Sequence, residues 1–399
     1  MEYSTLESWQ AMNENGLVYE IGSLMAQFGE IPDRRKARGK RYSLVTLLVL
    51  VFLAKLSGED SPYAIAEWCQ ARRESLVELL RLPYRQLPSH HTFRRLLGEV
   101  LEVEAFERLM RIYGAQQQGR AGAGQLLALD GKRLRGTSVP GEASVASTLA
   151  VYAVETNQVV AQVPTQAIGG EIASAAQVLE QVEVRGKVIL ADALHTQRPF
   201  CQQLVDRHGD YLLTLKDNQH RLYREVEQLF APNAANQNWL DVQTARAINK
   251  GHGRIEERRL QLVSLLPGEL DWPGLAQAFQ LERRFRFVRQ GQVVREEHKT
   301  HFGLTSLPPN KANANAILAM KRQYWQIETG LHYRRDVTFR EDATRMSRPQ
   351  AAYNLSIIHN TILSLFARLG LRNAASARRR LAVDPSLPFS LLVSAHPRL

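Results

Sequence analysis

The spacing of apolar residues predicts a helical region up to about residue 120. Apolar side chains recur three and four positions apart, as in Leu76, Leu79 and Leu80, which is the spacing of one face of an amphipathic helix. The most apolar stretch covers residues 44–54 and is too short to cross a membrane, which needs roughly 20 residues. With Ser43 as its N-cap, we expect this stretch to form a buried helix.

The pattern changes to short apolar runs after a glycine-rich linker at residues 121–124. The predicted strands are 125–130, 149–155, 158–164, 187–192 and 210–216. Helices are predicted at 172–182 and 198–208. The order is a three-strand meander followed by α/β alternation, which favours an RNase H-like fold, a mixed α/β sheet with flanking helices. A doubly wound parallel sheet would alternate from the beginning.

A β-rich insertion is predicted where the next helix of this fold is due. Its strand-like segments are 258–263, 284–289, 293–297 and 300–305, and one helical segment, 222–230, precedes them. A long helix, 311–334, and a second helix, 349–369, follow, and we expect the tail to be partly disordered. The predicted domains are a helical N-terminal domain (1–120), the first part of the core (125–217), the insertion (218–309), the second part of the core with the long helix (310–370) and a basic tail (371–399).

The charge of the chain indicates a polyanionic partner. The sequence has 51 Lys and Arg against 40 Asp and Glu, a net charge of +11, and its 44% apolar content is enough for a sizeable core. Nucleic acid is the first expectation, an anionic membrane the second, and a merely basic soluble protein the third.

Two cysteines far apart in sequence, Cys69 and Cys201, argue against a disulfide scaffold and against a cysteine-based zinc site. The polar N-terminus has no signal-peptide pattern, so we expect a cytoplasmic protein, associated with the nucleoid through its DNA partner. Neither a Walker loop nor an HExxH motif is present, which leaves nucleotide hydrolysis by a P-loop and zinc proteolysis unsupported.

Three carboxylates are candidates for chemistry. Asp130 ends the first predicted strand, Asp192 ends the fourth, and Glu328 lies in the long helix among basic residues. The first and fourth strands are neighbours in an RNase H-like sheet, so both aspartates are expected at one edge, with the helix packed across it. Taken singly, an aspartate at a strand end is more often a turn or cap residue, and a helical glutamate is more often solvated.

A cluster of this kind predicts a site for two divalent cations, with Mg²⁺ as the cofactor and Mn²⁺ as a substitute. Hard cations take carboxylate, phosphate and water oxygens. Two ions about 3.5–4 Å apart can activate the attacking oxygen and stabilise the leaving oxygen of a phosphodiester. Without metal, the mutual repulsion of Asp130, Asp192 and Glu328 is expected to destabilise the site.

Basic and polar residues in several segments are candidate DNA contacts. They are Arg34, Arg35, Lys36, Arg38, Lys40 and Arg41; His91, Arg94 and Arg95; Lys132, Arg133, Arg135 and His195; and His252, Arg254, Arg322, His332 and Arg335. Each segment also has an ordinary interpretation. The first is a solvated charge run, the second an amphipathic helix capped by Ser89, and residues 250–254 a hairpin loop. His195 can equally cap the next helix, and Tyr324 and Trp325 are expected in the core rather than stacked on a splayed base.

With these residues in place, the chain resembles a known family over nearly its whole length. The segments that carry the resemblance are FGEIPDRRKARGKRYSL, LPSHHTFRRLL, LDGKRLRG, ILADALHTQ, YLLTLKDNQ, GHGRIEERR, YWQIETGLHYRRDVTFREDATR and AAYNLSIIHN. The family is that of the H-repeat-associated, ISAs-type insertion-sequence transposases, a branch of the bacterial DDE transposases. Several motifs in order, on separate elements, are far more specific than any one of them.

The resemblance implies an RNase H-like core interrupted by a β-rich insertion, and a catalytic triad of Asp130, Asp192 and Glu328. It also implies Mg²⁺-dependent cutting and joining of DNA at the ends of a mobile element. Related transposases carry Tyr and Arg seven and four residues before the glutamate, and Lys seven after it. This chain has Lys321, Tyr324 and Arg335 there. We expect Arg335 to contact phosphate and Arg322 to replace part of the upstream pair.

The sequence therefore predicts a DNA transposase that frees a 3′-hydroxyl at an element end and joins it to target DNA. Its partners are double-stranded DNA, both terminal inverted repeats and target, and a second copy of the chain in a synaptic complex. Two alternatives remain: a metal-dependent nuclease of the same fold that cuts without joining, and a domesticated DNA-binding protein without catalysis.

Overall fold

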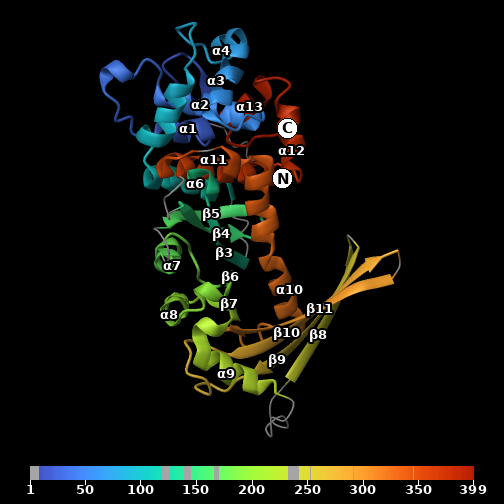
Figure 1. Ribbon diagram of the computed structural model, residues 1–399. Helices are drawn as coiled ribbons and strands as arrows, with labels where there is room; N and C mark the ends of the chain where they lie inside the picture. Colours follow the sequence, from blue (N-terminus) through green and yellow to red (C-terminus); the bar gives the residue numbers. More distant parts are fainter. Residues whose placement is uncertain are drawn as a thin grey trace, which may run out of the picture.

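A helical unit lies at one end of a long mixed sheet, and the far end of the sheet extends beyond the other helices (Figure 1). The computed structural model describes residues 9–118, 126–138, 145–165, 170–231, 242–251, 253–290, 292–344 and 346–399. The linker at 121–124 and His252, a candidate DNA contact, lie outside these residues. No helix of the described part is both long and apolar enough to cross a membrane.

The central sheet has the strand order of the RNase H-like fold. Its core strands are β3 (Leu126–Arg133), β4 (Ser147–Ala153), β5 (Gln158–Thr165), β6 (Val188–Ala191) and β7 (Asp210–Leu215). They lie side by side in the order β5-β4-β3-β6-β7. The first three form an antiparallel meander, and β6 and β7 then join in parallel. The predicted fold class is confirmed.

Helices cover both faces of this sheet. On one face lie α7 (Gly170–Glu180) and α8 (Arg198–Asp206), and on the other lie α10 (Ala314–Tyr324) and α11 (Pro349–Arg368) (Figure 1). Successive side chains of β3 point to opposite faces of the sheet. Leu127 and Leu129 pack into the core under α7 and α8, whereas Ala128 packs into the core on the opposite side. The side chain of Asp130 belongs to the same series as Ala128 and therefore faces away from α7 and α8.

The insertion lengthens the sheet instead of forming a separate one. After α9 (His220–Leu229) come β8 (Val242–Gly251), β9 (Arg254–Ser264), β10 (Gln277–Arg289) and β11 (Gln292–Thr305). Strand β11 pairs antiparallel with β7, which places the four strands in the order β11-β10-β9-β8 beyond the core. The β-rich character is as predicted, but the segments 293–297 and 300–305 are one strand, and β8 was not foreseen.

The N-terminal unit is mainly helical and contains a small hairpin that the sequence did not predict. The hairpin strands are β1 (Gln10–Met12) and β2 (Val18–Glu20). The helices are α1 (Leu24–Gly29), α2 (Leu44–Leu56), α3 (Pro62–Ala71), α4 (Arg73–Leu79), α5 (His90–Arg95) and α6 (Val103–Gln118). Helix α2 is the predicted buried helix, and the Ser43 side chain accepts a hydrogen bond from Thr46 N–H at its start.

Short irregular helical turns join these elements. The 3₁₀ turns are Ala37–Gly39, Arg135–Thr137, Ala193–His195, Asp217–Gln219 and Glu341–Ala343. The π-helical turns are Leu96–Val100, Ile327–His332 and Arg334–Thr338. The predicted helix 311–334 is helical from Ala314 onward, but the regular helix α10 ends at Tyr324 and the chain continues in π-helical turns to Thr338. The π-helical part contains Gly330, and among the amino acids only proline is a poorer helix former than glycine.

The C-terminal tail is folded, which corrects the expectation of partial disorder. It forms α12 (Ala374–Leu381) and α13 (Ser386–Val393), and both contribute to the core of the N-terminal unit. Arg378, one of three consecutive arginines in the basic tail, is buried. Its guanidinium donates hydrogen bonds to Lys55 O and to Asp60 Oδ1.

Candidate active site

Strands β3 and β6 deliver the two aspartates to one side of the sheet. Asp130 lies within β3, two residues beyond the last residue that pairs with β6, and not at the end of the strand as expected. Asp192 directly follows β6 as predicted, and its Oδ1 accepts a hydrogen bond from Leu194 N–H. The parallel pairing of Ala128 with Leu190 sets the level of both carboxylates, since each is two residues further along its own strand.

The π-helical turn after α10 brings Glu328 and His332 to the same side. Ile327 and Leu331 are buried in the core, so the residues that follow each of them are turned toward the sheet edge. A β-carbon at Gly330 would lie 2.5 Å from Tyr152 Oη, so this turn can pass close to β4 only with glycine there.

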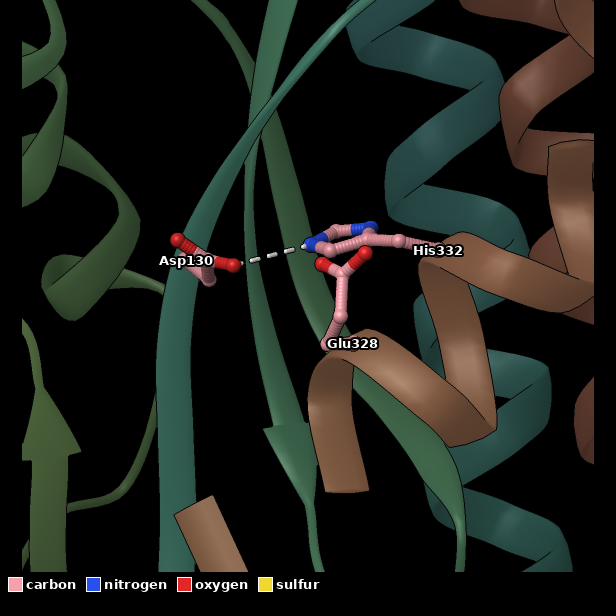
Figure 2. A group of neighbouring side chains, drawn as sticks. All are labelled: Asp130, Glu328 and His332. Carbon is pink, nitrogen blue, oxygen red and sulfur yellow. Dashed lines mark ion pairs between the residues drawn. The ribbon is translucent and has the colours of Figure 1, made fainter. Parts of the chain in front are cut away.

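Asp130, Glu328 and His332 form a compact group of possible metal ligands. Figure 2 shows the two carboxylates and the imidazole pointing into one small space. One ligand atom from each residue lies within 4.8 Å of the others, and His332 Nε2 is 3.4 Å from Asp130 Oδ2. Asp192 is not a member of this group, although it lines the same cavity.

The cavity is lined by both acidic and basic side chains. Its volume is about 300 Å³, and Asp130, Asp192 and Glu328 all line it. The cationic residues that line it are Lys216, Arg258, Arg283, Lys321 and Arg322. His301 lies there too, and burial, reinforced by Arg283 and neighbouring lysines, lowers its pKa. Carboxylates able to hold cations and side chains able to hold an anion therefore line the same cavity.

Lys321 is a potential functional residue that the sequence analysis named only as a departure from the family pattern. Its Nζ donates a hydrogen bond to Thr214 Oγ1 at 2.7 Å and lies over the rings of Phe279 and Tyr324. Burial of the ammonium group lowers its pKa to about 8, although the charge of Asp192 opposes this. The sequence indicates this residue only by a substitution: Lys321 stands where related transposases carry a tyrosine, seven residues before the glutamate.

Glu171 is a fourth carboxylate close to the site, and no sequence pattern indicated it. It lies in the first turn of α7, and its Oε1 is 2.2 Å from the position that a β-carbon at Gly131 would take. The glycine after Asp130 therefore leaves room for this carboxylate. On its other side, Glu171 Oε1 lies 3.4 Å from Nε2 of the buried His195.

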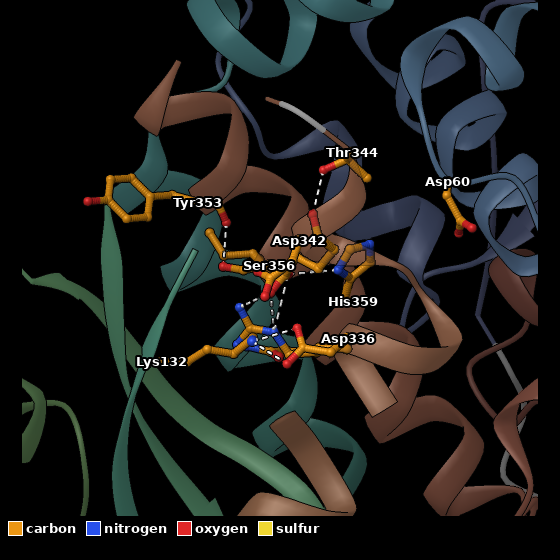
Figure 3. Close-up of polar contacts among 12 residues, drawn as sticks. Asp60, Lys132, Asp336, Asp342, Thr344, Tyr353, Ser356 and His359 are labelled. Carbon is orange, nitrogen blue, oxygen red and sulfur yellow. Dashed lines mark hydrogen bonds and ion pairs between the residues drawn. The ribbon is translucent and has the colours of Figure 1, made fainter. Parts of the chain in front are cut away.

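Several candidate DNA contacts are buried, which removes them from any DNA-facing surface in this conformation. His195 is 1% exposed and faces Glu171, and His332 is 4% exposed and faces Asp130. Lys132 is also buried, and its Nζ donates to both oxygens of Asp336, at 2.6 and 2.7 Å (Figure 3). Each of these three side chains contacts a protein carboxylate in this structure, and its contact with DNA stays a prediction.

The side chain of Arg335, for which a phosphate contact is predicted, is completely buried. Its guanidinium forms hydrogen bonds and an ion pair with Glu341, which also accepts from His359 Nδ1 at 2.9 Å. Burial acts to raise the pKa of Glu341, but Arg335 and His359 together hold it far below its usual range. Arg335 therefore stabilises the turn that follows Glu328 and does not face solvent.

The other described candidates are at least partly exposed. Those classed as exposed are Arg34, Lys36, Arg38, Lys40, Arg41, His91, Arg94, Arg95, Arg133, Arg135, Arg254 and Arg322. Arg35 is half-buried and is bound to Asp33 and to Tyr42 O. Trp325, expected in the core, is 54% exposed and lines the cavity, whereas Tyr324 is half-buried.

The arrangement fits a divalent cation. Oxygen ligands suit Mg²⁺ and Mn²⁺, and the three grouped ligand atoms need only small side-chain movements to reach one ion. Both ring nitrogens of His332 are buried without a hydrogen-bond partner among the described residues, which is costly unless a ligand completes them. An RNase H-like sheet whose cavity gathers three carboxylates and five lysines and arginines is suited to bind divalent cations and a polyanion.

Comparison with known proteins gives the family. The model for the transposase DDE domain matches residues 122–365, and the model named DDE_Tnp_1-associated matches residues 25–113. The chain belongs to the transposase DDE domain family, which confirms the resemblance stated from its motifs.

The chain is similar to the "H repeat-associated putative transposase YhhI" of Escherichia coli K12. The two are 26% identical over 94% of this chain and 99% of the relative. A protein from the dhlA 3′ region of Xanthobacter autotrophicus is 33% identical, over 64% of this chain and 87% of its own length. A solved structure of a piggyBac transposase synaptic complex with hairpin DNA covers 92% of this chain and 77% of that chain, with 11% identity and a TM-score of 0.40.

Proposed function

We propose that this chain is the transposase of a bacterial insertion sequence. It cuts DNA at the element ends and joins the freed 3′-hydroxyl to target DNA. The observation that carries the proposal is that Asp130, Asp192 and Glu328 line one cavity together with five lysines and arginines. Such a combination suits a phosphodiester, which needs its charge neutralised while metal ions act on the scissile bond.

In this proposal Asp130 and Glu328 hold one divalent cation, and Asp192 helps to hold a second. Bound Mg²⁺ or Mn²⁺ would supply Lewis-acid activation of the attacking and leaving oxygens. The protein keeps the carboxylates in place with buried neighbours: Ile327 and Leu331 fix the turn that carries Glu328. The Leu194 N–H orients Asp192, and the pairing of β3 with β4 fixes the backbone at Asp130.

In this proposal the lysines and arginines that line the cavity position the DNA strand. Lys321 is held by Thr214 and by two aromatic rings, so its ammonium group is fixed before DNA arrives. Arg283 is fixed by two hydrogen bonds to Glu256 Oε1, while Arg322 is exposed at the cavity wall. Lys321 and Arg283, which are held by protein contacts, and the exposed Arg322 would bind phosphates on both sides of the scissile bond.

The surface that binds the rest of the DNA is proposed to include the N-terminal unit. A hollow of about 620 Å³ there is lined by His91, Arg94 and Arg95 of α5 and, across from them, by Thr344 and Arg348. Its cations outnumber the nearby Glu99, which pairs with both Arg95 and Arg348. We further propose that two copies act together on two element ends, in the cytoplasm where the chromosomal DNA lies.

The test uses DNA that carries the sequences flanking this reading frame in its genome, labelled on each strand in turn. With Mg²⁺ or Mn²⁺, wild-type protein should nick or cut at the element boundary and give joined products with a target plasmid. Asp130→Asn, Asp192→Asn and Glu328→Gln should each lower cleavage by at least about 1,000-fold while DNA binding persists, since each removes a ligand needed only for the chemical step.

Asp206→Asn is the matched control, because Asp206 is an exposed aspartate on α8 that does not line the cavity. It should cut and join as the wild type does. Equal cleavage by wild type and the three cavity variants would contradict the assignment of the site. Cleavage without joined products would support the nuclease, and binding without metal-dependent chemistry would support the non-catalytic protein.

A further inference from the structure

His332 is a buried histidine to which the proposed function gives no role. It is 4% exposed, and neither ring nitrogen has a hydrogen-bond partner among the described residues. An imidazole buried in this way loses its hydrogen bonds to water, which destabilises the protein unless a ligand replaces them. Its Nε2 is aimed at the space between Asp130 and Glu328, as Figure 2 shows.

The distances suit coordination of one ion by all three residues. Ligand atoms bound about 2.1 Å from a small divalent cation lie about 3 Å apart when adjacent and up to about 4.2 Å apart when opposite. His332 Nε2 is 3.4 Å from Asp130 Oδ2, and the whole set lies within 4.8 Å. Glu328 and His332 are on one π-helical turn whose anchors, Ile327 and Leu331, are buried, so both side chains start from a fixed backbone.

We propose that His332 Nε2 is a ligand of the divalent cation held by Asp130 and Glu328, so that this position has two carboxylates and one imidazole. The inference rests on the proposed function, in that it requires the carboxylates to bind metal. It goes beyond that function because it assigns a nitrogen ligand and a metal preference. Imidazole suits transition metals, whereas Mg²⁺ strongly prefers oxygen, so the site should favour Mn²⁺ over Mg²⁺ more than an all-carboxylate site does.

His195 provides an internal comparison. It too is buried, both of its ring nitrogens lack hydrogen-bond partners in the described part of the chain, and its Nε2 lies 3.4 Å from a carboxylate oxygen, that of Glu171. However, His195 has no second carboxylate grouped with it as a possible ligand among the described residues, whereas His332 has two. Substituting each histidine in turn therefore distinguishes an imidazole that coordinates metal from one that only contacts a single carboxylate.

The experiment measures metal binding directly in the full-length protein without DNA. Mn²⁺ binding is followed by electron paramagnetic resonance, and pulsed spectra of the bound ion are recorded for nitrogen coupling. Mg²⁺ affinity is obtained by competition. We expect nitrogen coupling in the wild type and its loss in His332→Gln, with Mn²⁺ affinity lowered at least about tenfold and Mg²⁺ affinity lowered less. His195→Gln should retain both the coupling and the affinity.

The outcomes distinguish this inference from the proposed function. If Asp130→Asn abolishes Mn²⁺ binding but the wild-type spectrum has no nitrogen coupling, the carboxylates bind metal and the His332 assignment is wrong. Coupling that persists in His332→Gln but disappears in His195→Gln also overturns it. If the wild type binds no Mn²⁺ at all, both proposals fail. Should His332→Gln not fold, labelling wild-type histidines with ¹⁵N still decides whether any histidine coordinates the ion.

Discussion

One short stretch of chain contributes to two groups of acids and histidines that differ in how their charge is balanced. In the open group, Glu328 and His332 face Asp130, and of the described lysines and arginines none forms an ion pair with either carboxylate. In the closed group, Arg335 and His359 both bind Glu341, which is 4% exposed. The comparison teaches that protein cations neutralise the buried Glu341, which belongs to the scaffold, whereas the charges of Asp130 and Glu328 remain available to a bound ligand.

The closed group also connects the helical unit to the side of the sheet that carries Asp130 and Glu328. Lys55 of α2 and Arg378 of α12 both lie over the ring of Phe339, which packs against His359 (the latter is labelled in Figure 3). Burial and the charge of Lys55 lower the pKa of His359 to about 3, so the imidazole is neutral and donates its Nδ1–H to Glu341. This packing is what holds the turn between Glu328 and Glu341 in position.

The largest expected effect comes from breaking the closed group. Glu341→Gln leaves the fully buried Arg335 without its counter-charge, and such a loss typically destabilises a protein by about 3–5 kcal/mol. The same exchange at Glu328, which is exposed, should change the stability by less than about 0.5 kcal/mol. Urea unfolding followed by circular dichroism measures both. Similar midpoints for the two variants would contradict the distinction between the groups.

The next effect is loss of stability in acid, set by the closed group. The pKa of His359 is lowered from 6.5 to about 3 in the folded state, and that of Glu341 is lowered from 4.5. The unfolded chain therefore binds more protons below pH 6.5, first at His359 and then at Glu341. Stability should fall as the pH drops from 6.5, by up to about 1.4 kcal/mol per pH unit for each group.

Unfolding measured between pH 8 and pH 4.5 tests this dependence. His359→Phe removes the histidine contribution, so its stability should change less with pH between 6.5 and 4.5 than that of the wild type. The matched control is His91→Phe, since His91 is exposed on α5. Parallel pH profiles for wild type and His359→Phe would show that another group governs the acid transition.

The sequence predicted the parts of this site that depend on local pattern and strand order. Asp130 and Asp192 follow apolar runs, and the order of those runs is enough to bring them to neighbouring strands. It could not predict that Lys132 and Arg335 are buried, because that depends on Asp336 and Glu341, which reach them only after the chain has folded. Glu171 was missed for the same reason: its contact with Gly131 joins α7 to β3.

The smallest expected effect is a gain in stability when the open group loses a charge in the absence of metal. At pH 8 with chelator and low salt, Asp130→Asn should raise the free energy of unfolding by up to about 1 kcal/mol, because it relieves the repulsion between Asp130 and the nearby Glu328.

Asp336→Asn is the matched control: it removes the partner of the buried Lys132 and should destabilise the protein. Added Mn²⁺ should reverse the order, since it stabilises the wild type by binding and cannot do so equally in Asp130→Asn. If Asp130→Asn is as destabilising as Asp336→Asn, the carboxylate of Asp130 is part of the scaffold, and the contrast between the open and closed groups does not hold.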